Sequence, residues 1–195
     1  MIPKFMRLGI VTILKIICEK ITIKNIEIVN KNNKLKGVID ELYIKAESII
    51  FNKIYISNIN IKLSNLVLRF ALNNKKFFIN NCSTLLHMRL SKDNINETIF
   101  NKNWNRLKTS IESYILMSFQ SIEIHNNSIY FISSDKLPNK DIKYTLKYDE
   151  NSISLVNNIN QRRLTLINDK NISVNNLFLY ENYIEVELSS KIKFN

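Results

Sequence analysis

Apolar residues recur with two different periods along the chain, and the change of period divides it into segments. Near the N-terminus they fall at intervals of three and four, as on one face of a helix. Runs such as 54–70 instead step by two, which is typical of strands with one apolar face. We therefore expect an amphipathic helix over 1–19, a first β meander over 20–90, a central helical segment over 91–117 and a second β meander over 118–195.

The helical stripe of the first segment consists of Met6, Ile10, Ile13, Leu14 and Ile17. Lys4, Arg7 and Lys15 lie largely on the other side. Two interpretations stay open for such a helix. It packs on a sheet, or it lies on a membrane with its cations toward the head groups.

Two further interpretations of the same segment are a transmembrane helix and a cleavable leader. A membrane span needs about 20 apolar residues, and this stretch is shorter and is interrupted by Lys15. Lys4 and Arg7 followed by an apolar run are typical of a leader, but no A-x-A cleavage site follows. We expect no cleavable signal peptide and no transmembrane helix, and hence a cytoplasmic or peripheral membrane protein.

The strand-like segments carry signs of curvature and of a helix start. The apolar face of 54–70 changes parity at Ser57-Asn58 and again at Ser64-Asn65, and each change predicts a bulge, a twist or a tight turn. Ser91 is the predicted N-cap of the central helical segment, with Asp93 in the first turn.

No strand–helix–strand alternation is present, so a parallel sheet is not expected. The fold class predicted is α+β, mostly β, with long curved antiparallel sheets wrapped around one or two helices. No abrupt shift in composition marks a linker, so residues 1–195 are expected to form a single domain.

The net charge and the glycine content limit the classes of function that the sequence allows. The net charge of +11 favours anionic partners, namely nucleic acid, anionic lipid or an acidic protein. The abundance of Ile, Asn and Lys is also what AT-rich codons produce, so part of this charge reflects codon usage. With Gly9 and Gly37 as the chain's two glycines, no phosphate-cradling loop can be written, which excludes dinucleotide enzymes and P-loop NTPases.

Catalytic and metal-binding patterns are missing from the sequence. His87 and His125 have no second ligand at metal-binding spacing, and no G-x-S-x-G elbow occurs. Cys18 and Cys82 are far apart and are interpreted as small buried residues. The carboxylates are spaced as on solvated strand faces; they are Asp40, Glu41, Glu47, Glu185 and Glu187. We expect a non-enzymatic protein with no cofactor and no metal.

Two stretches resemble a known family. Residues 35–68, LKGVIDELYIKAESIIFNKIYISNINIKLSNLVL, and residues 88–99, MRLSKDNINETI, are similar to segments of the LmeA-like phospholipid-binding family, especially its cyanobacterial branch. The resemblance runs from about Lys36 to Leu116. It implies a tubular, lipid-binding-like fold, phospholipid binding and no enzymatic activity of its own.

Together these observations predict a non-catalytic protein that binds phospholipid or an anionic membrane surface through an apolar groove, in lipid transfer or envelope maintenance. The predicted lining is Met6, Ile10, Leu14, Ile54, Ile56, Leu66 and Leu68, with Lys4, Arg7 and Lys15 as head-group or membrane contacts. The same apolar residues are equally compatible with a solid core. A basic nucleic-acid-binding module is the alternative, since Lys and Tyr interleave in KYTLKY at 143–148. A structural adaptor that binds a protein partner at a sheet edge is the third possibility.

Overall fold

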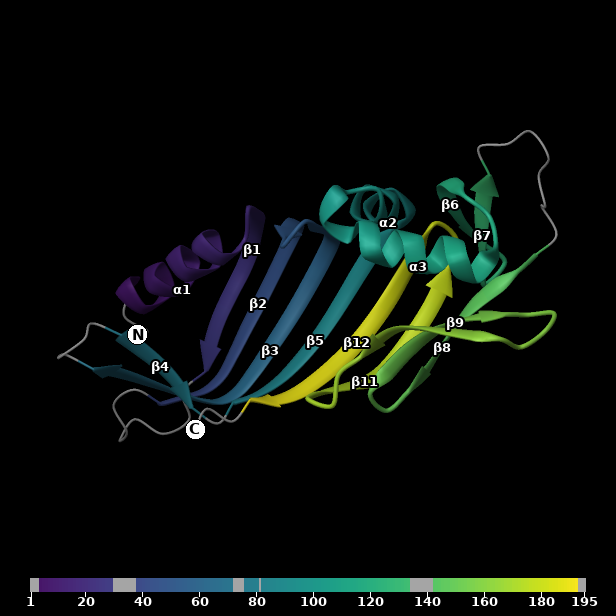
Figure 1. The fold of residues 1–195 in the computed structure, drawn as a ribbon. Coiled ribbons are helices and arrows are strands. Elements are labelled where there is room, and N and C mark those ends of the chain that lie inside the picture. Colours follow the sequence, from purple (N-terminus) through teal and green to yellow (C-terminus); the bar gives the residue numbers. More distant parts are fainter. Residues whose placement is uncertain (1–3, 30–37, 72–75, 81, 134–141, 193–195) are drawn as a thin grey trace.

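The chain folds into two antiparallel sheets and a set of helices that lie against one face of the larger sheet (Figure 1). The computed structural model describes residues 4–29, 38–71, 76–80, 82–133 and 142–192. Within these residues the architecture is the predicted one, mostly β with long curved antiparallel strands and three α-helices.

The larger sheet holds seven strands of the described chain. Across the sheet they follow the order β1 (Lys20–Val29), β2 (Val38–Phe51), β3 (Ile54–Ala71), β5 (Cys82–Ser91), β12 (Tyr183–Ile192) and β11 (Ile172–Tyr180), and β4 (Lys76–Asn80) also pairs with β3. The last hairpin, β11–β12, thus returns to pair with β5, although it lies more than 90 residues further along the chain.

Cross-strand pairs place an unbroken apolar row across this sheet. The row runs through Ile26, Ile44, Ile61, Leu86, Leu188 and Val174. A parallel row runs through Ala46, Ile59, Met88, Val186 and Leu177. Side chains that face each other across strands stabilise the pairing, so both rows hold β1–β3 and β11–β12 in one continuous inner face.

Both parity changes predicted in 54–70 are irregular points of a single long strand. Asn65 has a φ of 59°, in the left-handed region. At the other point the register places Ser57 opposite Ser48, whose φ is 52°. The face turns over on both strands there, so Ile49 and Ile56 remain buried together. The inner face therefore stays apolar while the strands bend.

The smaller sheet stands at the β11–β12 end of the larger one (Figure 1). Its order is β10 (Arg163–Asn168), β9 (Ser152–Asn157), β8 (Tyr144–Asp149), β7 (Ser128–Ser133) and β6 (Phe119–His125). Backbone hydrogen bonds tie the two sheets: the Asn182 N–H donates to the Ile124 carbonyl at 3.1 Å, and the Val174 N–H donates to the Glu150 carbonyl at 2.7 Å.

The helices divide the inner face between them. They are α1 (Lys4–Ile17), α2 (Lys92–Ile99), the 3-10 turn η1 (Lys102–Trp104) and α3 (Asn105–Ile115). α1 packs over β1–β3, whereas α2 and α3 pack where the two sheets meet (Figure 1). None of the described helices is long and apolar enough to cross a membrane.

Candidate functional site: an apolar chamber between the sheets

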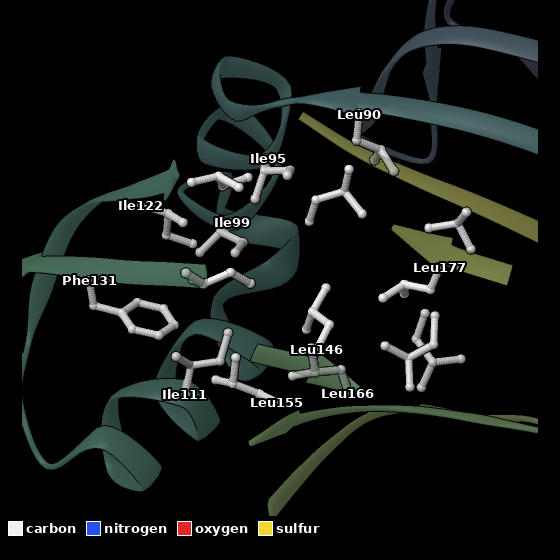
Figure 2. Close-up of a pocket in the computed structure, with 16 residues that line it drawn as sticks. Leu90, Ile95, Ile99, Ile111, Ile122, Phe131, Leu146, Leu155, Leu166 and Leu177 are labelled. Carbon is white, nitrogen blue, oxygen red and sulfur yellow. The ribbon is translucent and has the colours of Figure 1, made fainter. Parts of the chain in front are cut away.

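The two sheets and the helices α2 and α3 enclose an apolar chamber of about 190 Å³ (Figure 2). Sixteen residues from ten elements line it. They are Leu90, Ile95, Ile99, Ile111, Ile122, Ile124, Ile129, Phe131, Leu146, Ile153, Leu155, Leu166, Ile167, Leu177, Ile184 and Val186. All are aliphatic or aromatic, so the chamber offers shape and apolar surface and no hydrogen-bonding group of a side chain.

The exposure of the lining residues distinguishes an inner wall from a mouth. Ile124 and Leu155 are almost fully buried and form part of the inner wall. Leu146 and Leu166 are half-buried, and Ile167 is 46% exposed. Ile167 is the most exposed residue of the lining, so the chamber reaches solvent at β10, and Figure 2 shows Leu146 and Leu166 beside one another.

α2 is fixed as one wall by polar contacts at its first turn. The Ser91 hydroxyl caps it by accepting from the Asn94 N–H at 3.2 Å, as the sequence predicted. Ser57, at the irregular point of β3, donates to the Asn94 side-chain oxygen and accepts from the Ser91 N–H at 3.1 Å. This arrangement turns Ile95 and Ile99 toward the chamber.

A second anchor joins α2 to the smaller sheet. The Asn96 amide pairs with the backbone of Ile122 in both directions, donating to its carbonyl at 3.1 Å and accepting from its N–H at 2.7 Å. A side-chain amide here imitates the edge of a neighbouring strand. The contact fixes β6 against α2 without placing a polar atom in the chamber.

α3 and a row of aromatic rings complete the wall. The Tyr114 hydroxyl donates to the Arg162 carbonyl and accepts from the Asn157 N–H at 3.1 Å, which ties α3 to the β9–β10 turn. Phe131 packs edge-on against Phe119 and Tyr144, with centroids 5.0 and 5.3 Å apart. Burial raises the pKa of the Tyr144 phenol, so this ring stays neutral in the wall.

The described residues of the predicted lining lie elsewhere. Ile10 and Leu14 of α1 pack onto the core cluster that contains Leu66, and Ile54 and Ile56 belong to the neighbouring cluster around Ala46. None of these lines the chamber. At this end, α1 seats directly on the sheet. The side chains of Lys4, Met6 and Leu68 lie outside the described part of the structure.

The predicted membrane contacts on α1 have a different neighbourhood from the one expected. Arg7 and Lys15 are exposed. Beside them the outward side of the helix is not polar, since Leu8, Ile13 and Ile16 are 66%, 47% and 76% exposed. The spacing placed Ile13 and Ile17 in one stripe with Ile10 and Leu14, but Ile13 and Ile17 are exposed, so the helix has a second apolar face.

The titratable groups considered for chemistry are on outer surfaces. The Nε2 of His87 lies 3.8 Å from one carboxylate oxygen of Glu185, and the other oxygen of that carboxylate pairs with Arg89 at 2.6 Å. His125 stacks on Tyr130 at 4.1 Å. Glu47 pairs with Lys24, and Glu41 accepts from the Tyr43 hydroxyl.

The two cysteines are unpaired thiols within the core. Cys82 is buried in the cluster under α1, and Cys18 packs on the cluster around Ala46. Burial raises the pKa of the Cys18 thiol, which keeps it protonated at neutral pH. Cys82 is therefore a small buried residue, as predicted, whereas Cys18 is half-buried.

The sequence contained a signal for the chamber, but not its position. Leu146, Leu155, Leu166 and Leu177 each stand at an alternating position of a late strand. Apolar alternation indicates that one face of a strand is buried. It does not indicate where the buried faces of two sheets leave a space between them.

Compared with models of known protein families, with curated proteins and with solved structures, the chain has no match. The resemblance to the LmeA-like family therefore stays a prediction.

Proposed function

We propose that the protein binds phospholipid without catalysing a reaction, and that it encloses the end of one acyl chain in the chamber. The observation that carries the proposal is the lining, in which sixteen apolar side chains surround about 190 Å³ with an opening at Leu146, Leu166 and Ile167. A site without any polar side chain selects for hydrocarbon, since a polar group placed there would lose its hydrogen bonds to water.

The volume sets the length of chain that is held. An engineered apolar cavity of about 150 Å³ stays dry and takes benzene, so the chamber accommodates roughly six carbon atoms. At about 0.8 kcal/mol for each buried CH₂ group, a six-carbon segment gains about 5 kcal/mol. The head group and the rest of the lipid remain outside the mouth.

The nucleic-acid alternative has weaker support from the same contacts. Tyr144 is buried in the aromatic wall and is not free to stack on a base. In the doublet 162–163, the Arg162 guanidinium lies 5.9 Å from the Tyr114 ring, and Arg163 is 3.9 Å from Asp149. These side chains already have protein partners, which lowers the gain from contacting phosphate.

Lipid extraction of the purified protein, followed by mass spectrometry, tests the proposal. We expect about one phospholipid for each chain of the unmodified protein. Leu146→Phe, which fills the mouth of the chamber, should remove most of it, while Leu85→Phe on the outer face of β5 should not. A purified protein that neither carries lipid nor takes it up from vesicles would overturn the proposal.

A further inference from the structure

A second apolar surface lies at the other end of the sheet, where three segments meet. The outer face of α1 is formed by Leu8, Ile13, Ile16 and Ile17, all between 47% and 76% exposed. Near the C-terminal end of α1 lie Phe51, the last residue of β2 and 46% exposed, and the half-buried Trp104 in η1. These six residues are called the apolar rim below.

Hydrogen bonds and an ion pair hold the three segments of the rim together. The Glu19 N–H, just after α1, donates to the Ile50 carbonyl at 2.9 Å, and the Glu19 carboxylate pairs with Lys53 of the turn. The indole N–H of Trp104 donates to the Asn52 carbonyl at 3.3 Å. These contacts hold the C-terminal end of α1, the β2–β3 turn and η1 together, and the exposed apolar side chains of the rim belong to these segments.

The charges around the rim are mostly positive. Residues 7–20, 51–53 and 100–108 hold seven Lys and Arg and one acid, Glu19. That acid is neutralised by Lys53. Among the described residues, Lys15, Lys20 and Lys102 are exposed and form no ion pair. The rim therefore combines exposed hydrocarbon with unpaired positive charge.

We propose that the apolar rim is the surface with which the protein docks on an anionic phospholipid bilayer. Isoleucine and phenylalanine enter the interface, Trp104 lies at head-group depth, and the surrounding cations contact anionic lipids. A nucleic acid would match the charge but not the aliphatic surface. The inference rests on the proposed lipid binding in that the bilayer supplies the lipid, yet it concerns a surface separate from the chamber.

The single tryptophan makes the docking directly observable. Added vesicles of phosphatidylcholine with one-third phosphatidylglycerol should shift Trp104 emission to the blue, and lipids brominated near the head group should quench it. This measurement uses the unmodified protein, so it does not depend on the stability of a variant. Binding to the vesicles without any change in Trp104 emission would overturn the proposal.

Flotation with the same vesicles separates the two contributions. Ile16→Ser with Phe51→Ser should weaken binding at least about tenfold, whereas Ile159→Ser, equally exposed at 73% in the β9–β10 turn, should leave it unchanged. Lys15→Glu with Lys102→Glu should weaken binding at least about tenfold, and should do so on anionic vesicles alone. The control pair is Lys147→Glu with Lys170→Glu, both exposed away from the rim. Circular dichroism checks the fold of each variant.

Three outcomes would count against the rim: equal flotation of the rim and Ile159 variants, equal flotation of both charge pairs, or a dimer in sedimentation that Ile16→Ser dissociates. The last would make the rim a contact between two copies of the chain. The proposed function fails in a different way, since Leu146→Phe leaves the rim intact. A protein that floats through its rim but never carries lipid would refute the chamber alone.

Discussion

The two ends of the large sheet differ in how the same apolar face is covered. Over β1–β3, α1 seats directly on the strands, and Ile39, Leu42 and Ala46 are no more than 2% exposed. Over β11–β12, the face is covered by α2, α3 and a second sheet, which leave about 190 Å³ unfilled. We call these the closed end and the chamber end.

The comparison shows that apolar alternation alone does not decide between a core and a cavity. Ala46 and Val186 belong to one cross-strand row and are both buried, yet only Val186 lines the chamber. A helix laid along a sheet fills the grooves between side chains. Where two sheets and two helices converge from different directions, their side chains do not all reach the centre.

Truncation of a buried leucine should have the largest effect on the free energy of unfolding, and it should do so at both ends. Leu42→Ala at the closed end and Leu155→Ala at the chamber end each delete a fully buried side chain. We expect each to lower the free energy of unfolding by about 2–5 kcal/mol in urea denaturation.

A ligand should then distinguish the two leucine variants. A short-chain phospholipid at 100 times its dissociation constant returns about 2.7 kcal/mol to a protein that binds it when folded. We expect Leu155→Ala, with its enlarged chamber, to respond differently from wild type, and Leu42→Ala to gain the wild-type increment. Identical gains in all three proteins would break the comparison between the ends.

Substitution by a larger side chain should change the free energy of unfolding by less, but the change should differ more clearly between the two ends. Ala46→Leu forces three carbon atoms into a filled core, so it should cost about 1–3 kcal/mol. Val186→Phe adds more carbon atoms but places them in the chamber, and it should change stability by less than about 1 kcal/mol. Urea denaturation of the two variants decides this, and an equal loss would mean that the chamber has no usable room.

The cap of α2 offers a test of intermediate size. Ser91→Ala removes the hydroxyl that accepts from the Asn94 N–H, which should cost about 1 kcal/mol. Because α2 is a wall of the chamber, hydrogen exchange should quicken in α2 and β6. Exchange in β1 and β2 should stay at its wild-type rate, and uniform acceleration would show that the two ends unfold as a unit.

Much of the local structure was predictable because its causes are local. The predicted first helix corresponds to α1, Ser91 is the cap that its side chain and position indicate, and Asn65 takes a left-handed conformation where the apolar parity shifts. Each of these depends on a few neighbouring residues.

The remainder depends on pairing between distant segments. Leu188 of β12 lies beside Leu86 of β5, and nothing in either strand specifies the other as its partner. The position of the chamber follows from this pairing. The second apolar face of α1 was also missed, because Ile13 fits the inward stripe by its spacing while the helix turns it outward.

The smallest expected effect concerns the closed end and pH. The hydrogen bond from Lys53 lowers the pKa of the exposed Glu19 carboxyl below its ordinary value of 4.5. A lowered folded-state pKa contributes stability above the unfolded value, and the contribution is lost as pH falls through the lowered one. Thermal unfolding of Glu19→Gln should therefore differ slightly from wild type at pH 7 and converge with it in acid. A difference that grows in acid would contradict the ion pair.

The central claim is that hydrocarbon enters the chamber end and not the closed end. Methyl NMR with a monomeric phospholipid carrying a nitroxide at the tip of its acyl chain, in the absence of vesicles, tests this most directly. The account predicts strong broadening of methyl signals from Ile111, Leu155 and Leu177, with those of Ile28, Ile39 and Leu42 unchanged. Broadening at the closed end, or equal broadening at both ends, would contradict it.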